Sequence, residues 1–315
     1  MFLFYTLNKN IYEYNYYIYI MINHIVLSGG GPYGFITYGC LKKLNLLNYW
    51  NIKNIKSIYG TSIGSIIGSI LCLNINWEIL DNYFINRPWD KALKNEIDNY
   101  LLHLINNNGI DGIKFIQTIM EPLLMSKNID INVTLKEYFD LTKIELYIYV
   151  TNVNKMENIE FSYKSYPNIK LIEALSASSG YPLIFKPMFI DNMCLLDGGI
   201  LNTFPLNNCI INNNLKNDEN TLCINLKLFK NKNIDISMNI FELTYSILKK
   251  THLLIDNNMN YNNFKKIITI NCVNELNLKI ENNIWLDVIN HDSNIKNKLI
   301  KIGEQKAEKF CLYNM

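Results

Sequence analysis

A G-x-S-x-G pattern is the first feature of this chain that could do chemistry. It reads Gly60-Thr61-Ser62-Ile63-Gly64. It follows the apolar run 54–60 and leads into the small, apolar stretch 62–73. A serine in a sharp strand-to-helix turn, with glycines on both sides that let neighbouring backbone come close, is typical of a nucleophile elbow. A plain turn, in which Ser62 only caps the following helix, is the alternative.

A row of glycines follows the preceding apolar run, 24–28. The glycines are Gly29, Gly30, Gly31 and Gly34. They can be a dinucleotide fingerprint, or they can offer backbone N–H groups to an oxyanion. A dinucleotide domain needs an acidic residue about 20 residues further on. No Asp or Glu lies between Asn45 and Gly60, so we expect an oxyanion hole rather than a nucleotide site.

A serine nucleophile also needs a base, and the stretch 195–205 offers Asp197. This residue ends an apolar run and precedes Gly198 and Gly199. Apolar surroundings raise the proton affinity of a carboxylate, which makes it a better acceptor for a serine proton. An Asp-Gly pair is also common in ordinary turns, so this segment alone does not decide between the two.

The histidines provide an alternative base. In the order Ser, Asp, His, either His252 or His291 could complete an α/β-hydrolase triad. His252 falls within the predicted helix 239–258 and His291 in a polar stretch, and neither has a local signature.

The elements that must position these residues alternate along the chain. Apolar runs predict strands, and helical spacing predicts helices. The predicted strands are 24–28, 54–60, 144–153, 221–229 and 265–272, with a hairpin or strand at 188–199. The predicted helices are 34–48, 62–73, 169–180, 239–258 and 293–312, and several more lie within 76–140. This alternation predicts an α/β fold with a mainly parallel central sheet flanked by helices.

The domain organisation is expected to be simple. We expect one domain over residues 21–315, in which 76–140 forms a helical insertion or cap. Its aromatics Trp77, Phe84 and Trp89 are either membrane contacts or core residues. Residues 1–20 are expected to be an extension outside the fold, and they match neither a signal peptide nor a membrane span.

Composition excludes several classes. The net charge of +2 argues against nucleic acid as a partner. The seven cysteines contain no C-x-x-C pair, which fits buried free thiols in an intracellular, reducing compartment better than a metal site or a disulfide framework.

Together the motifs resemble the patatin-like phospholipases. The resemblance covers about His24 to Leu206: G-G-G-x-x-G, then G-T-S-x-G, then D-G-G followed by Asn202 and Pro205. The stretch 174–187, ALSASSGYPLIFKP, also resembles the family's helix and proline-flanked turn before the aspartate. The resemblance implies a three-layer sandwich and a lipid acyl hydrolase that needs no catalytic histidine, metal or other cofactor.

Carried over to this sequence, the resemblance implies Ser62 as nucleophile and Asp197 as base. The oxyanion glycines would be Gly29, Gly30, Gly31 and Gly34, with Gly60, Gly64, Gly198 and Gly199 supporting the turns. One departure is Tyr33, which takes a slot that often holds a basic residue in the family. The implied substrate is a phospholipid or another acyl ester, met by peripheral contact with a membrane surface. The alternatives are an esterase with a Ser–Asp–His triad and a catalytically impaired lipid-binding protein.

Overall fold

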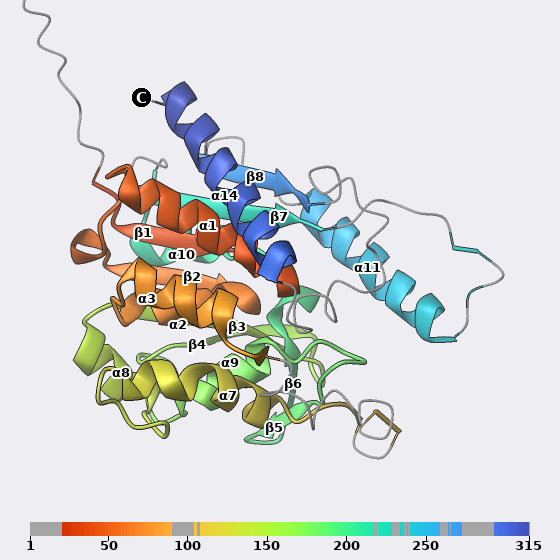
Figure 1. Cartoon of the computed structure of the whole chain (residues 1–315). Coiled ribbons are helices and arrows are strands. Elements are labelled where there is room, and N and C mark those ends of the chain that lie inside the picture. Colours follow the sequence, from red (N-terminus) through yellow and green to blue (C-terminus); the bar gives the residue numbers. More distant parts are fainter. Residues whose placement is uncertain are drawn as a thin grey trace, which may run out of the picture.

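The computed structural model describes residues 21–89, 104–105, 108–216, 220–228, 234–235, 238, 240–258, 264, 266–272 and 293–314. Its centre is an eight-stranded sheet (Figure 1). The strands are β1 (His24–Leu27), β2 (Ser57–Thr61), β3 (Glu145–Asn152), β4 (Glu157–Phe161), β5 (Met188–Ile190), β6 (Met193–Asp197), β7 (Thr221–Lys227) and β8 (Ile267–Asn271). Their order is β5-β6-β3-β2-β1-β7-β8, and β4 pairs with β3.

The sheet divides into a parallel part and an antiparallel part. β3, β2, β1, β7 and β8 pair in parallel. β4 and β6 run antiparallel to β3, and β5 and β6 form an antiparallel hairpin. The predicted, mainly parallel sheet is therefore confirmed. The sequence did not predict β4, whose residues are largely polar.

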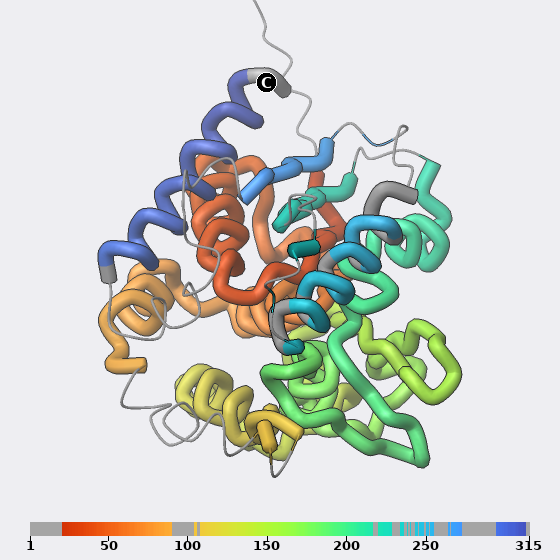
Figure 2. Tube along the Cα trace, turned by 90° about the vertical axis from the view of Figure 1, so that its right-hand side faces the viewer, coloured from red at the N-terminus to blue at the C-terminus, as the bar shows by residue number. Residues whose placement is uncertain are grey.

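Helices cover both faces of this sheet. They are α1 (Gly34–Leu46), α2 (Ile63–Cys72), α3 (Trp77–Asp81), α7 (Gly112–Met125), α8 (Leu135–Thr142), α9 (Leu171–Ser178), α10 (Leu206–Asn213), α11 (Ile240–Asn258) and α14 (Ser293–Asn314), with short 3-10 turns η1 (Gly31–Tyr33), η2 (Ile52–Asn54) and η4 (Gly198–Ile200) and a π-helical turn η3 (Asn82–Asn86). Figure 2 shows α1 and α14 on one side of the strands and α10 and α11 on the other. The expected layered α/β architecture is therefore present.

Successive residues of the strands pack into two different hydrophobic clusters, one on each face of the sheet. In β3, Leu146 and Ile148 face the large aliphatic cluster, whereas Tyr147 and Tyr149 face a smaller aromatic one. Successive strand residues point to opposite faces of the sheet. Both faces are covered, so the parallel strands appear in the sequence as nearly continuous apolar runs.

The aromatics of the predicted cap pack inward. Trp89 is 7% exposed, and its indole N–H donates to the Phe84 carbonyl at 3.0 Å. Trp77 and Phe84 are half-buried and make edge-to-face contacts with Tyr38. The core interpretation of these three residues is therefore correct, and the membrane-contact interpretation is not supported.

Two further expectations concern cysteines and membrane spans. All seven cysteines are free thiols, and all but Cys194 are buried. In the described part of the chain, no helix has the length and apolar character that crossing a bilayer requires.

Candidate active site

The site begins where two strands meet on one edge of β3. β2 pairs with β3 up to Thr61, which lies opposite Tyr149, and β6 pairs with β3 from Asp197, which lies opposite Val150. β4 occupies the other edge of β3 along the same residues. Because a strand has only two edges, β2 and β6 must share one and meet end to end. Their last residues therefore bring the start of the elbow beside Asp197, although the two are distant in sequence.

Ser62 occupies the turn between β2 and α2 in a conformation that few residues adopt. Its backbone has φ 53° and ψ −126°. Such a conformation costs about 1–3 kcal/mol and persists only where the surroundings enforce it. The strained serine at a strand-to-helix turn is the geometry expected of a nucleophile elbow. The N-terminus of α2 also places its positive dipole end next to this serine.

The glycine at the start of α2 allows this turn to approach β1. A Cβ on Gly64 would lie 2.5 Å from the carbonyl oxygen of Leu27 and 2.7 Å from that of Ser28. Both contacts are to backbone atoms, so no side-chain rotation could relieve them. The close approach therefore requires glycine, and it brings the elbow against the residues that precede the glycine row.

The Ser62 hydroxyl points at the Asp197 carboxylate. Ser62 Oγ donates to Asp197 Oδ2 over 2.6 Å, and both side chains are buried. The other carboxylate oxygen, Oδ1, accepts the N–H of Gly199 at 2.7 Å. The two sequence-predicted residues thus form a hydrogen-bonded pair, and Gly199 fixes the orientation of the carboxylate.

Burial sets the protonation behaviour of this carboxylate. It raises the pKa of Asp197 to about 6, against the lowering effect of the hydrogen bonds from Ser62 and Gly199. A carboxylate that is a stronger base than usual, yet still mostly ionised at neutral pH, suits a general base.

The residues after Asp197 accept hydrogen bonds from both the elbow segment and the glycine row. The Thr61 hydroxyl donates to the carbonyl of Asn202 at 2.8 Å, and the N–H of Gly29 donates to the carbonyl of Thr203 at 2.9 Å. The segment after η4 therefore holds the elbow on one side and the first glycine on the other. The sequence pattern around Asn202 pointed to this segment but did not show its contacts.

The glycine row, Gly29–Gly34, is called the glycine loop below. The amide of Gly29 is engaged with Thr203, and that of Gly34 donates to the carbonyl of Gly31. Among the described residues, the amides of Gly30 and Gly31 have no acceptor. Of the four expected oxyanion donors, Gly30 and Gly31 are therefore the ones whose N–H groups remain available.

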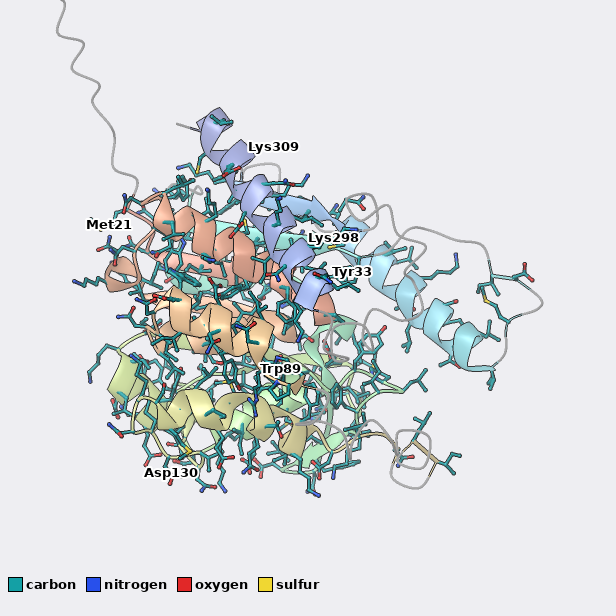
Figure 3. All side chains as sticks on the ribbon, viewed as in Figure 1. Met21, Tyr33, Trp89, Asp130, Lys298 and Lys309 are labelled. Atoms are coloured by element: carbon teal, nitrogen blue, oxygen red, sulfur yellow. The ribbon has the colours of Figure 1, made fainter. Side chains whose placement is uncertain are left out.

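The glycine loop lies against the serine. A Cβ on Gly29 would stand 3.4 Å from Ser62 Cβ, which is ordinary contact distance. Pro32 and Tyr33 belong to η1, which leads directly into α1. Figure 3 shows Tyr33 on the side of the molecule where β7 and β8 end. This is the carboxyl edge of the parallel strands, where sites of open α/β sheets form.

Of the histidines, His24 lies at the start of β1, at the opposite end of the parallel strands from Ser62, where its Nδ1 is 2.7 Å from Ser57 Oγ. The side chain of His252 and the whole of His291 lie outside the described residues, as do residues 1–20. In the described part of the chain, no group of three or more His, Cys, Asp or Glu is arranged to hold a metal ion.

Sequence reasoning missed the end of α9 as part of the site. Ser178 Oγ accepts the N–H of Ser62 at 2.9 Å, and the carbonyl of Gly180 accepts the N–H of Asp197 at 3.0 Å. The run of small residues in ALSASSG was recognised only as part of a resemblance. A serine within a run of small residues at the end of a predicted helix, shortly before the aspartate, is the signal that could have identified it.

The order of these motifs is matched by a family model. The model described as patatin-like phospholipase covers residues 25–210, which is more than half of the chain. The chain belongs to the patatin-like phospholipase family. The match spans the glycine loop, the elbow and the aspartate turn, so every part of the candidate site lies within it.

A curated viral protein is similar to this chain in sequence. A curated relative named "Probable lipid hydrolase 463L", from Invertebrate iridescent virus 6, is 29% identical over 194 residues; the match covers 61% of this chain and 65% of the relative, just under two thirds of its length.

Among solved structures, the patatin-like chain is similar to VipD from Legionella pneumophila, with a TM-score of 0.49, 15% identity, and coverage of 89% of this chain and 67% of that one. It is also similar to ExoU of the type III secretion system of Pseudomonas aeruginosa, crystallised in complex with SpcU, with a TM-score of 0.38, 12% identity, and coverage of 91% and 53%.

Proposed function

We propose that this patatin-like protein hydrolyses carboxylic esters of lipids, with Ser62 as nucleophile and Asp197 as its general base. The observation that carries the proposal is the 2.6 Å hydrogen bond between Ser62 Oγ and a buried carboxylate whose pKa is raised to about 6. A serine activated by an adjacent base is the general requirement for acyl transfer. Family membership and the name of the viral relative support the same class of substrate.

The proposed reaction has two steps. Asp197 accepts the Ser62 proton while Ser62 Oγ attacks the ester carbonyl, and the amides of Gly30 and Gly31 stabilise the oxyanion. The protonated Asp197 then gives its proton to the leaving alcohol. A water, deprotonated by the same carboxylate, next attacks the acyl-serine, releases the fatty acid and restores the Ser62 hydroxyl.

The charge distribution of the site fits an apolar acyl ester. Four segments build the site: 28–35, 60–66, 177–185 and 197–206. Asp197 is the one charged residue in them. Oxyanion stabilisation therefore rests on backbone dipoles in this arrangement, and Tyr33 brings no cation to the glycine loop. We propose that the substrate is a lipid ester presented at a membrane surface.

The test is product analysis on lipid vesicles. Phosphatidylcholine vesicles carrying a neutral glyceride are incubated with each protein, and released fatty acid is measured by mass spectrometry. Ser62→Ala is expected to reduce release by about 10⁴-fold or more, because the covalent route is lost. Asp197→Asn is expected to cause a similarly large loss.

The matched control is Ser69→Ala, which removes another buried hydroxyl from α2. Its Oγ donates to the carbonyl of Ile66, within the same helix. It should retain activity and the circular dichroism of the parent. Release of fatty acid by Ser62→Ala at the parent rate would contradict the proposal.

A further inference from the structure

Ser178 makes two hydrogen bonds that a helix serine does not ordinarily make. Its side chain is fully buried at the end of α9. Ser178 Oγ donates to the carbonyl of Tyr149 at 2.7 Å and accepts the N–H of Ser62 at 2.9 Å. A serine inside a helix commonly bonds a carbonyl of the preceding turn. Here the hydroxyl instead connects β3 to the elbow.

The direction of these bonds follows from the proton count. A hydroxyl has one hydrogen to donate, and a carbonyl oxygen can only accept. The Ser178 proton is therefore committed to Tyr149, and a lone pair is turned toward the N–H of Ser62. Since Tyr149 is the register partner of Thr61, the residue before Ser62, the Ser178 hydroxyl links two adjacent backbones at the point where the elbow turns.

The same helix end also holds the aspartate. Two residues after Ser178, the carbonyl of Gly180 accepts the N–H of Asp197 at 3.0 Å. One short segment thus binds the backbone amides of both members of the pair. The separation of Ser62 from Asp197 is set by contacts to α9 as well as by the sheet.

We propose that Ser178 is a positioning residue that holds the backbone of Ser62 in its positive-φ conformation, the one from which Oγ reaches Asp197. The inference rests on the proposed function, since it assigns a role within the same site. It also assigns the Ser62 amide to a structural bond, so that amide is not available to an oxyanion.

The experiment compares Ser178→Ala with the parent on a soluble short-chain ester, across a range of pH. Loss of the acceptor lets Ser62 leave its conformation. Removing a group that orients a metal ligand lowers activity by about 10–100-fold in metal sites, and we expect kcat to fall by a similar factor here. KM should change by less than about twofold, because the glycine loop is untouched.

The pH profile provides a readout that a purely structural role would not move. Burial raises the pKa of Asp197, and the hydrogen bonds from Ser62 and Gly199 oppose it; no charged side chain of the described residues contributes. Weakening the Ser62 bond must therefore raise that pKa further. The acid limb of kcat should move to higher pH in Ser178→Ala.

Two further variants separate positioning from folding. Ser176→Ala removes a buried hydroxyl two residues earlier on α9, and it should keep the parent kcat and acid limb. Ser178→Cys keeps the shape of the side chain with a somewhat larger atom, but that atom accepts hydrogen bonds weakly. It should give a kcat between those of the parent and the alanine variant, so the inference can be tested even if Ser178→Ala does not fold.

The outcomes are distinct. If the parent works through Ser62 while Ser178→Ala and Ser178→Cys keep its kcat and its acid limb, the positioning role is overturned and the proposed function stands. If the parent shows no turnover that Ser62→Ala removes, the proposed function fails and this inference fails with it.

Discussion

The glycine loop and the turns that carry the Ser62–Asp197 pair use their backbone amides in opposite ways. Around the pair, the N–H groups of Ser62, Asp197 and Gly199 all have protein acceptors. In the glycine loop, Gly30 and Gly31 have none among the described residues. The turns that carry Ser62 and Asp197 are therefore fixed by protein hydrogen bonds, while the loop keeps two amide donors available.

This difference follows from what each part has to do. A nucleophile and its base must keep their geometry through the reaction, so saturated hydrogen bonding benefits them. An oxyanion hole must instead present unsatisfied donors in a fixed frame. The loop obtains that frame from Gly29 and Gly34, whose amides are bonded to Thr203 and Gly31.

Among variants that keep the Ser62–Asp197 pair itself, the largest effect is expected where the elbow packs against the end of β1, just before the glycine loop. In an exposed helix, replacing Gly by Ala usually gains about 1 kcal/mol. At Gly64 the new Cβ would stand 2.5 Å from the Leu27 carbonyl oxygen, so the substitution should lower the free energy of unfolding instead of raising it. We expect Gly64→Ala to lose at least about 3 kcal/mol of unfolding free energy and about 100-fold or more in kcat. Denaturant titration and ester hydrolysis measure the two.

Gly68→Ala is the matched control on the same helix. Its Cβ would approach Ile58 Cγ2, a side-chain atom, at 2.9 Å. The cost should be smaller because that side chain can shift. Equal losses in the two variants would show that the contact between the elbow and the end of β1 has no special role.

The next largest effect is the loss of activity expected when Asp197 becomes protonated at low pH. With a pKa of about 6, the ionised and active form predominates above that pH and is lost as pH falls through it. We expect kcat/KM to decrease about tenfold per pH unit below about 6. A soluble neutral ester assayed from pH 4 to 9 measures the profile. Activity that stays constant down to pH 4 would rule out a base with this pKa.

The glycine loop, in which the amides of Gly30 and Gly31 remain available, is tested at Gly30. A Cβ there would stand 2.5 Å from Leu226 Cδ1, the end of a buried side chain, so Gly30→Ala must shift either that side chain or the loop. Losing one oxyanion donor typically costs about 10²–10³ in kcat, and a displacement should cost less, about tenfold. Adding Leu226→Val removes the clashing atom and should restore much of the rate. If the double variant recovers nothing, the methyl group itself is the obstacle and the clash is not the cause.

The smallest effect is expected at the histidines. His252→Ala and His291→Ala should each change kcat by less than about twofold, since Asp197 already accepts the hydrogen bond of the Ser62 hydroxyl. Short-chain ester hydrolysis and the persistence of the acid limb near pH 6 in both variants are the measurements. A loss of about 10³-fold in either one would favour a Ser–Asp–His triad over the pair.

Much of this site could be predicted from local sequence. The elbow, the glycine row and the Asp-Gly-Gly turn each depend on short-range backbone requirements, which particular residue types satisfy wherever they occur. The parallel strands were predictable because burial on both faces makes them continuous apolar runs. The polar strand β4 lacks that signal, so it was missed.

The sequence by itself determined which chemistry was available: a serine, a carboxylate and a row of amides, each at the end of a strand. Only the tertiary structure decided that they lie together. Ser62 and Asp197 meet because β2 and β6 share one edge of β3, and register between distant strands has no local signature. Ser178 belongs to the site, and Gly29 has a bonded amide, for the same reason: their partners are supplied by segments far away in the chain.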